Sequence, residues 1–194
     1  LFGYKTYTKI THALGTLSTS FKGSKNNKNW DHQIQTLQLN TVNFGDWELI
    51  HPSTIHTNSA NIQSEPICFN LKQSQPNQTC INFQWEPNHQ WSGSIDSHGT
   101  NLDSLTHYLF PSQTHLNGNL QLTATASGQA THIQSATINS SIKKGKITYI
   151  TQNQTHTTPI QTAQTHWVFK KHTLSTDTNI ELHTDNHITS QLSI

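Results

Sequence analysis

The two cysteines of the chain, Cys68 and Cys80, are the residues whose spacing most directly suggests chemistry. Each lies in a short run of alternating apolar residues, Ile67–Leu71 or Thr79–Trp85. Because side chains alternate between the faces of a strand, an antiparallel hairpin about residue 74 places the two cysteines opposite each other. Paired residues in such a hairpin lie about 4.5–5.5 Å apart, which is within disulfide range. We therefore predict a structural disulfide and an oxidising compartment, with a redox pair as the alternative.

The fourteen histidines do not have the spacing of a metal site. Zinc sites use closely spaced ligands, such as two cysteines or histidines a few residues apart. The pair most similar to this, His183 and His187, lies in a segment with strand character, where four residues span about 13 Å. The acidic residues are dispersed, and no nucleophile motif, phosphate loop or nucleotide fingerprint is present. We predict no catalytic residue, no metal site and no cofactor, and therefore no enzyme.

The composition indicates an ordered polypeptide whose polar residues are mostly uncharged. Charged residues make up 11% of the 194 residues and the net charge is +1, so neither strong self-repulsion nor a basic nucleic-acid-binding surface is expected. No stretch approaches the roughly 18 apolar residues of a membrane span. Since the chain contains no Met, even at position 1, we expect residues 1–194 to be a single segment of a larger protein.

Alternation of apolar and polar residues recurs along the whole chain and predicts an all-β, antiparallel-rich sheet with one apolar face. At 31% hydrophobic residues, the chain has too little apolar material for a second sheet to cover that face. A closed sandwich core would nevertheless produce the same alternation. If the face is open, we expect it to line an elongated apolar groove that is accessible to a ligand. The expected lining residues are Phe69, Leu71, Phe83, Trp85, Leu120, Leu122, Ile138 and Ile147.

Three irregularities interrupt the alternation of apolar and polar residues. Leu37 and Leu39 change parity relative to Ile34, which predicts a β-bulge. Pro52 should end or kink a strand. Lys144-Gly145 is interpreted as a turn.

One segment, residues 101–111, has helical periodicity instead. Leu102, Leu105 and Leu109 fall on one helical stripe, and Pro111 ends it. We predict a short amphipathic helix, which is either a crossover between strands or a plug on the apolar face.

Several motifs, in this order, resemble the TamB family of the AsmA-like superfamily. They are Trp30–Leu39 followed by Gly45–Leu49, the cysteine hairpin ending at Trp85, Leu102–Pro111 leading into Leu116–Leu122, and Ala136–Ser141 followed by Lys144–Ile147. The resemblance covers roughly residues 14–150 and corresponds to the middle region of the family. It implies that residues 1–194 are a single segment of a larger periplasmic β-repeat protein. The heavy use of Asn, Gln, His and Thr departs from common family members.

The resemblance implies a long, strongly curved sheet, called a β-taco, with a hydrophobic concave groove. It also implies a non-enzymatic bridge in the periplasm, tethered to the inner membrane by a segment outside residues 1–194. The expected role is phospholipid transport to the outer membrane and protein assembly there. The implied partners are phospholipid acyl chains and, through the full-length protein, a TamA-like outer-membrane barrel; nucleic acid is not expected.

Two other classes of protein are compatible with the same composition. A secreted β-solenoid or adhesin-like passenger would show a regular coil period, which we do not find. A carbohydrate-active β-sandwich would need converging carboxylates beside a tryptophan in a cleft.

Overall fold

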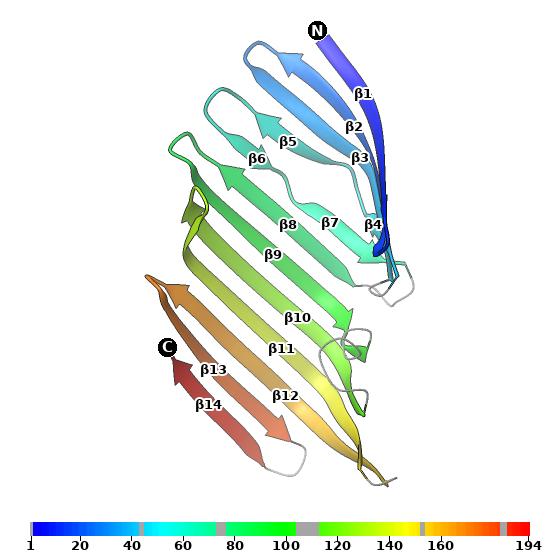
Figure 1. Cartoon of the computed structure of the whole chain (residues 1–194), viewed down its shortest axis with the longest axis vertical. Coiled ribbons are helices and arrows are strands. Elements are labelled where there is room, and N and C mark those ends of the chain that lie inside the picture. Colours follow the sequence, from blue (N-terminus) through cyan, green and yellow to red (C-terminus); the bar gives the residue numbers. More distant parts are fainter. Residues whose placement is uncertain (1, 43–44, 73–76, 104–112, 152–153, 183–185) are drawn as a thin grey trace. The chain divides into compact units, whose positions relative to one another are not determined.

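The structure is a computed structural model that describes residues 2–42, 45–72, 77–103, 113–151, 154–182 and 186–194. These residues form a 14-stranded sheet (Figure 1), which confirms the all-β prediction. The strands are β1 Phe2–His12, β2 Gly15–Asn26, β3 Asn29–Thr41, β4 Gly45–Leu49, β5 Ser53–Thr57, β6 Ile62–Ser64, β7 Ile67–Leu71, β8 Gln78–Trp85, β9 Gln90–Asn101, β10 Thr114–Gln129, β11 His132–Thr151, β12 Gln154–Lys170, β13 Thr173–Leu182 and β14 His187–Ser193.

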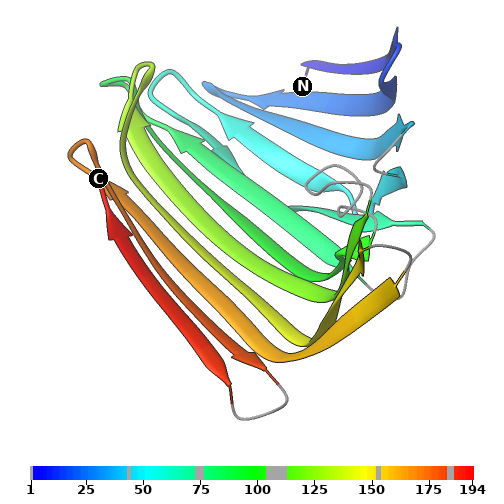
Figure 2. The same cartoon turned by 60° about the horizontal axis from the view of Figure 1, so that its bottom comes forward.

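The order of the strands is a meander, in which most neighbours in the sheet are also neighbours in the chain. The order is β1-β2-β3-β4-β7-β8-β9-β10-β11-β12-β13-β14, with β5 paired to β3 and β6, and β6 paired also to β8. The successive hairpins can be followed by colour in Figure 2. The antiparallel pairing excludes a parallel β-solenoid, and a single sheet is not a sandwich.

The chain divides into two compact units, which we describe separately. Unit 1 comprises Leu1–Asp96 and Thr125–Ile133, and unit 2 comprises Ser97–Ala124 and Gln134–Ile194. Fully buried apolar side chains are few in the described residues: Ile34 and Ile67 in unit 1, and Leu102 and Ile160 in unit 2. A sheet with one uncovered apolar face has this burial pattern, because most of its apolar side chains are covered on their sides only.

In unit 1, prolines lie in two of the breaks between consecutive strands. Pro52 separates β4 from β5, as predicted, and Pro66 separates β6 from β7. Proline cannot donate a ladder hydrogen bond, so side chains supply partners near the breaks. Ser64 Oγ accepts a hydrogen bond from Phe83 N–H (2.9 Å), and Ser53 Oγ donates to the Glu65 carbonyl (3.4 Å). Both serines are buried, at 2% exposure for Ser53 and 6% for Ser64.

The predicted bulge after Ile34 is confirmed by the register of β2 and β3. Ser20 pairs with Thr36 but Phe21 pairs with Ile34, so Gln35 is an extra residue in β3. Leu37 and Leu39 therefore lie on the same face as Ile34, and so does Trp47 of β4, which pairs with Leu39.

The interpretation of Lys144-Gly145 as a turn is wrong, because β11 runs without a break from His132 to Thr151. Lys144 instead has a positive φ of 55° within the strand, and Lys143 and Lys144 are both exposed. A Cβ placed on Gly145 would lie 3.0 Å from Ile142 Cγ2 and 3.8 Å from Ile160 Cβ. Gly145 thus lies on the face of Ile142, although strict alternation would place it on the other.

Residues 104–111 of the helix predicted over residues 101–111 lie outside the described residues, so the helix stays a prediction, together with the places of Leu105 and Leu109. Its first three residues are described, and Asn101 is the last residue of β9. Leu102 is buried, with 5% exposure, and its N–H donates to the Gly118 carbonyl (2.9 Å). Asn101 Oδ1 accepts from Asp103 N–H (2.9 Å). The described residues contain no helix of the length and apolarity that crossing a membrane requires.

Candidate functional site: the apolar faces of the sheet

The strand registers of unit 1 place its apolar side chains on one face. Phe69 pairs with Leu49 on one side and with Thr79 on the other, and Leu71 pairs with Trp47. Alternation along β8 then carries Phe83 and Trp85 to the same face. We call this the apolar face of unit 1. Its apolar members are Ile10, Leu17, Phe21, Trp30, Ile34, Leu37, Leu39, Trp47, Leu49, Ile55, Ile62, Ile67, Phe69, Leu71, Ile81, Phe83 and Trp85.

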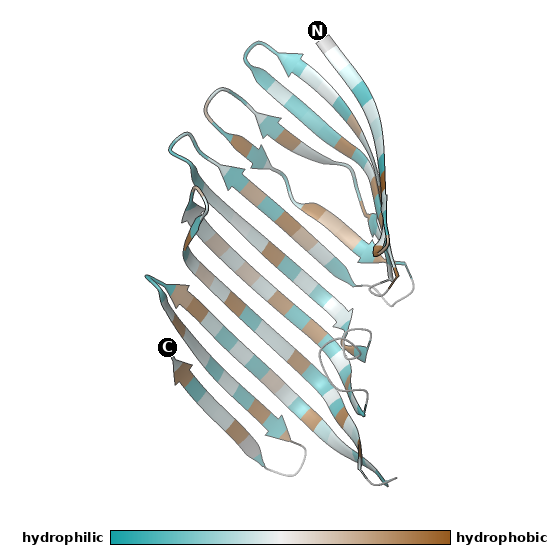
Figure 3. Cartoon of the chain, viewed as in Figure 1, coloured by the Kyte–Doolittle hydropathy of each residue, from teal (hydrophilic) through white to brown (hydrophobic). Residues whose placement is uncertain are grey.

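Unit 2 has an apolar face of its own. Ile138 pairs with Trp167, and Ile142 pairs with Ala163. Leu120 and Leu122 belong to this face, because Gln121 between them bonds to Ser141 on the opposite side of the sheet. The apolar members of the face are Leu120, Leu122, Ile138, Ile142, Ile147, Tyr149, Ile160, Ala163, Trp167, Phe169, Leu174, Ile180, Leu182, Ile188 and Leu192. Figure 3 shows the alternation as bands of brown and teal along the strands.

The expected groove residues fall into two sets of four. Phe69, Leu71, Phe83 and Trp85 share the apolar face of unit 1, and Leu120, Leu122, Ile138 and Ile147 share that of unit 2. Ile147 shares its face with Ile138 because of the backbone irregularity at Lys144. Phe83, Trp85 and Ile138 are 37–39% exposed, so they offer surface to a ligand. The prediction of the groove omitted other members of the two faces, such as Trp47 and Trp167. These residues could have been found from the same alternation of apolar and polar residues along their strands.

Charged side chains are almost confined to the opposite faces, which we call the polar faces. In strands β11–β13 of unit 2, the charged residues that have a register partner lie on the polar face: Lys143, Lys146, Lys170, Asp177 and Glu181. Lys144 has no register partner and is exposed. In β1–β8, the residues on the polar face are Lys5, Lys9, Lys22, Asp31, Asp46 and Glu48. The exception in β1–β8 is Lys25 at the end of β2, which pairs with Trp30 on the apolar face.

The disulfide lies on the polar face of unit 1. Cys68 and Cys80 are paired in the register of β7 and β8 and are bonded to each other, with their Cα atoms 4.0 Å apart. The bond is therefore on the opposite side of the sheet from Phe69 and Phe83. This position suits a structural crosslink, because it holds the hairpin together without occupying the apolar surface.

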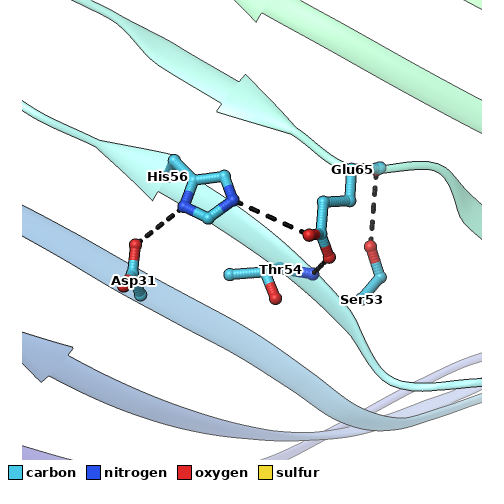
Figure 4. Close-up of polar contacts among 5 residues, drawn as sticks. All are labelled: Asp31, Ser53, Thr54, His56 and Glu65. Atoms are coloured by element: carbon cyan, nitrogen blue, oxygen red, sulfur yellow. Dashed lines mark hydrogen bonds and ion pairs between the residues drawn. The ribbon is translucent and has the colours of Figure 1, made fainter.

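A further set of polar contacts in unit 1, around His56, is exposed and solvated. His56 Nδ1 lies 2.7 Å from Asp31 Oδ1, and His56 Nε2 lies 3.8 Å from Glu65 Oε1 (Figure 4). Glu65 Oε2 also accepts a hydrogen bond from Thr54 N–H (3.0 Å). The side chains of His56 and Asp31 are about half exposed, so water screens the pair and its contribution to stability is small, about 0–1 kcal/mol.

The polar face of unit 2 has a hollow of about 390 Å³, lined mainly by amide, hydroxyl and imidazole side chains. His166 Nδ1 lies 2.6 Å from Asn139 Oδ1, and Asn139 Nδ2 donates to Thr123 Oγ1 (3.4 Å). These side chains are largely occupied with one another. Across the described parts of the chain, no group of three or more His, Cys, Asp or Glu side chains is arranged to hold a metal ion.

The family model described as "TamB, N-terminal domain" matches residues 8–194. No curated protein and no solved structure matches the chain.

Proposed function

Because the chain belongs to the TamB family, we propose that its apolar faces bind phospholipid acyl chains during lipid transport to the outer membrane. Proteins of this family act with TamA in outer-membrane assembly and in lipid transport, and they are not enzymes. They are anchored in the inner membrane and span the periplasm. A TamB-like role in lipid transport or assembly is therefore the general function of this chain.

Three more specific proposals, on location, ligand groove and partner, extend this general role. We propose that the chain acts in the periplasm, that its apolar faces line a β-taco groove, and that a TamA-like barrel is the partner of the full-length protein. The place of the chain within its parent protein stays a prediction: the sequence motifs resemble the middle region, whereas the matching model is described as the N-terminal domain.

The observation that carries the proposal is an exposed apolar face without charge in unit 2. Ile138 and Trp167 are each 39% exposed, and Ile188 and Leu192 are each 54% exposed. Contiguous apolar surface of this kind marks an interaction site, since leaving it in water costs about 25 cal/mol per Å². An acyl chain gains about 0.8 kcal/mol for each buried CH₂ group, and a charge on the face would oppose this gain.

The test compares one charge on the two faces of a single strand. In Leu122→Asp the carboxylate is on the apolar face, whereas in the control Thr123→Asp it is on the polar face. Both variants are expressed in the periplasm, and the lipid bound to the purified protein is extracted and measured by mass spectrometry. We expect Leu122→Asp to lose most of the bound phospholipid and Thr123→Asp to retain it, with the Cys68–Cys80 bond formed in both.

The result that contradicts the proposal is equal lipid recovery from the two variants, or no lipid from the wild-type protein. Ile138→Asp provides an independent position on β11. If it unfolds the protein, a photo-crosslinking residue at position 138 replaces it. Crosslinks from that position to acyl chains are then expected, and their absence would count against lipid binding at this face.

A further inference from the structure

Lys25 is an exception to the distribution of charge in unit 1. Among the charged residues of strands β1–β8, it is the one on the apolar face, where it pairs with Trp30 of β3 and with Phe2 of β1. No carboxylate shares this face in β1–β8 as described, so the cation has no ion-pair partner there. An exposed ammonium group at the border of an apolar surface suits a ligand with an anionic group and an apolar tail.

One aromatic ring lies beside this cation, and two further rings lie against that one. Lys25 Nζ lies 5.5 Å from the centroid of the Trp30 ring. The Trp30 ring is stacked on His32, with centroids 5.9 Å apart and an interplanar angle of 5°. Tyr4 lies beside both rings, at 6.2 Å from Trp30 and 6.0 Å from His32. We call Tyr4, Lys25, Trp30 and His32 the aromatic–lysine cluster.

The cluster lies at a border, with apolar side chains on one side of it and the solvent-exposed hairpin end on the other. Phe21 and Ile34, which pair with each other, follow the cluster along β2 and β3, and Ile34 is buried. In the other direction, the strands end at the turn between Asn26 and Asn29. Tyrosine and tryptophan favour such a border, since their rings are apolar and each carries a polar group. For the same reason these residues are enriched at the headgroup level of membranes, where lysine also places its charge in the interface.

We propose that the aromatic–lysine cluster binds the phosphate of a glycerophospholipid whose acyl chains lie on the apolar face of unit 1. Lys25 contributes the charge, as lysine does in many phosphate sites. The Trp30 ring beside Lys25 carries an indole N–H donor, and Tyr4, which lies against the Trp30 ring, carries a hydroxyl. This inference rests on the proposed function, and it adds an orientation: the headgroup lies at the β2–β3 hairpin end, with the chains directed along the strands toward Phe21 and Ile34.

The experiment uses two lysines of the same strand that differ in the face they occupy. Lys25→Gln removes the charge from the apolar face, whereas Lys22→Gln removes it from the polar face three residues away. The probe is dihexanoylphosphatidylglycerol below its micellar concentration, titrated by calorimetry. We expect Lys25→Gln to weaken binding by roughly tenfold and Lys22→Gln to leave it unchanged, because a hydrogen bond to a charged group is lost only in the first. Lys25→Arg should restore binding.

Two further titrations identify the ligand group. Dihexanoylglycerol has the same chains without the phosphate, and it should bind wild type and Lys25→Gln equally. Inorganic phosphate alone should bind at least tenfold more weakly than the phospholipid; equal binding would indicate a free-phosphate site and overturn the proposal. An equal loss in Lys22→Gln and Lys25→Gln would indicate unspecific attraction and also overturn it.

The two proposals fail in different ways. If dihexanoylglycerol binds but Lys25→Gln has no effect on the phospholipid, acyl-chain binding stands and the phosphate site is refuted. If dihexanoylglycerol does not bind while phosphatidylglycerol binds through Lys25, the phosphate is recognised and acyl-chain binding is refuted. Unchanged thermal unfolding of each variant shows that the binding data report the site rather than the fold.

Discussion

The hydroxyl of Tyr4 lies 2.6 Å from Nδ1 of His32, although strand β2 separates the two residues. The residue between them in this row is Gly23, which pairs with both. A Cβ on Gly23 would overlap the Tyr4 ring, so the contact depends on the missing side chain. An aromatic ring that covers a strand glycine compensates for the weak packing of that glycine.

We therefore predict coupling between Gly23 and Tyr4. Gly23→Ala should destabilise the wild-type protein by about 1 kcal/mol, because the ring must leave and its hydrogen bond is lost. In a Tyr4→Ala background, the same change should be neutral or stabilising, since alanine loses less backbone entropy than glycine. Urea denaturation of the four proteins measures the interaction energy. Equal effects of Gly23→Ala in both backgrounds would contradict the contact.

The disulfide should contribute to stability through the unfolded state. Closing the loop between Cys68 and Cys80 should stabilise the fold by roughly 3 kcal/mol in the chain-entropy model. Mass analysis of periplasmic protein without reductant should find no free thiol. Reductant should then lower the urea midpoint of the wild type but not that of a Cys68→Ser, Cys80→Ser double variant. Two free thiols in the untreated protein would show that the bond does not form.

Asn77 should be important for the same hairpin. Asn77 is 2% exposed, and its Oδ1 accepts a hydrogen bond from Leu71 N–H (2.9 Å). Asn77→Ala leaves a donor without this partner, so we expect a loss of about 1–3 kcal/mol. The neighbouring Gln78 is exposed, and Gln78→Ala should change stability by less than about 0.5 kcal/mol. Thermal unfolding of both variants measures the difference, and the melting temperature of Asn77→Ala should be the lower one. Similar melting temperatures would argue against the role of Asn77.

The sequence by itself determined which residues face together within each regular stretch of strand. Alternation is a property of a single extended segment, so it could be recognised from Phe69 and Leu71, or from Leu120 and Leu122, without knowledge of neighbouring strands. The pairing of Cys68 with Cys80 was accessible for a similar reason, because a short hairpin connects adjacent strands with a register fixed by its loop.

Only the tertiary structure decided the relationships between strands and the places where alternation fails. One extra or irregular residue in a strand moves every later side chain to the opposite face of the sheet. The face of Ile147 therefore depended on the positive φ of Lys144, at a position where the sequence predicted a turn and the structure has an unbroken strand. The cluster of Tyr4, Lys25 and Trp30 arises from the registers of three strands and from the space over Gly23. No local pattern contains those registers, because they result from packing and hydrogen bonding across the whole sheet.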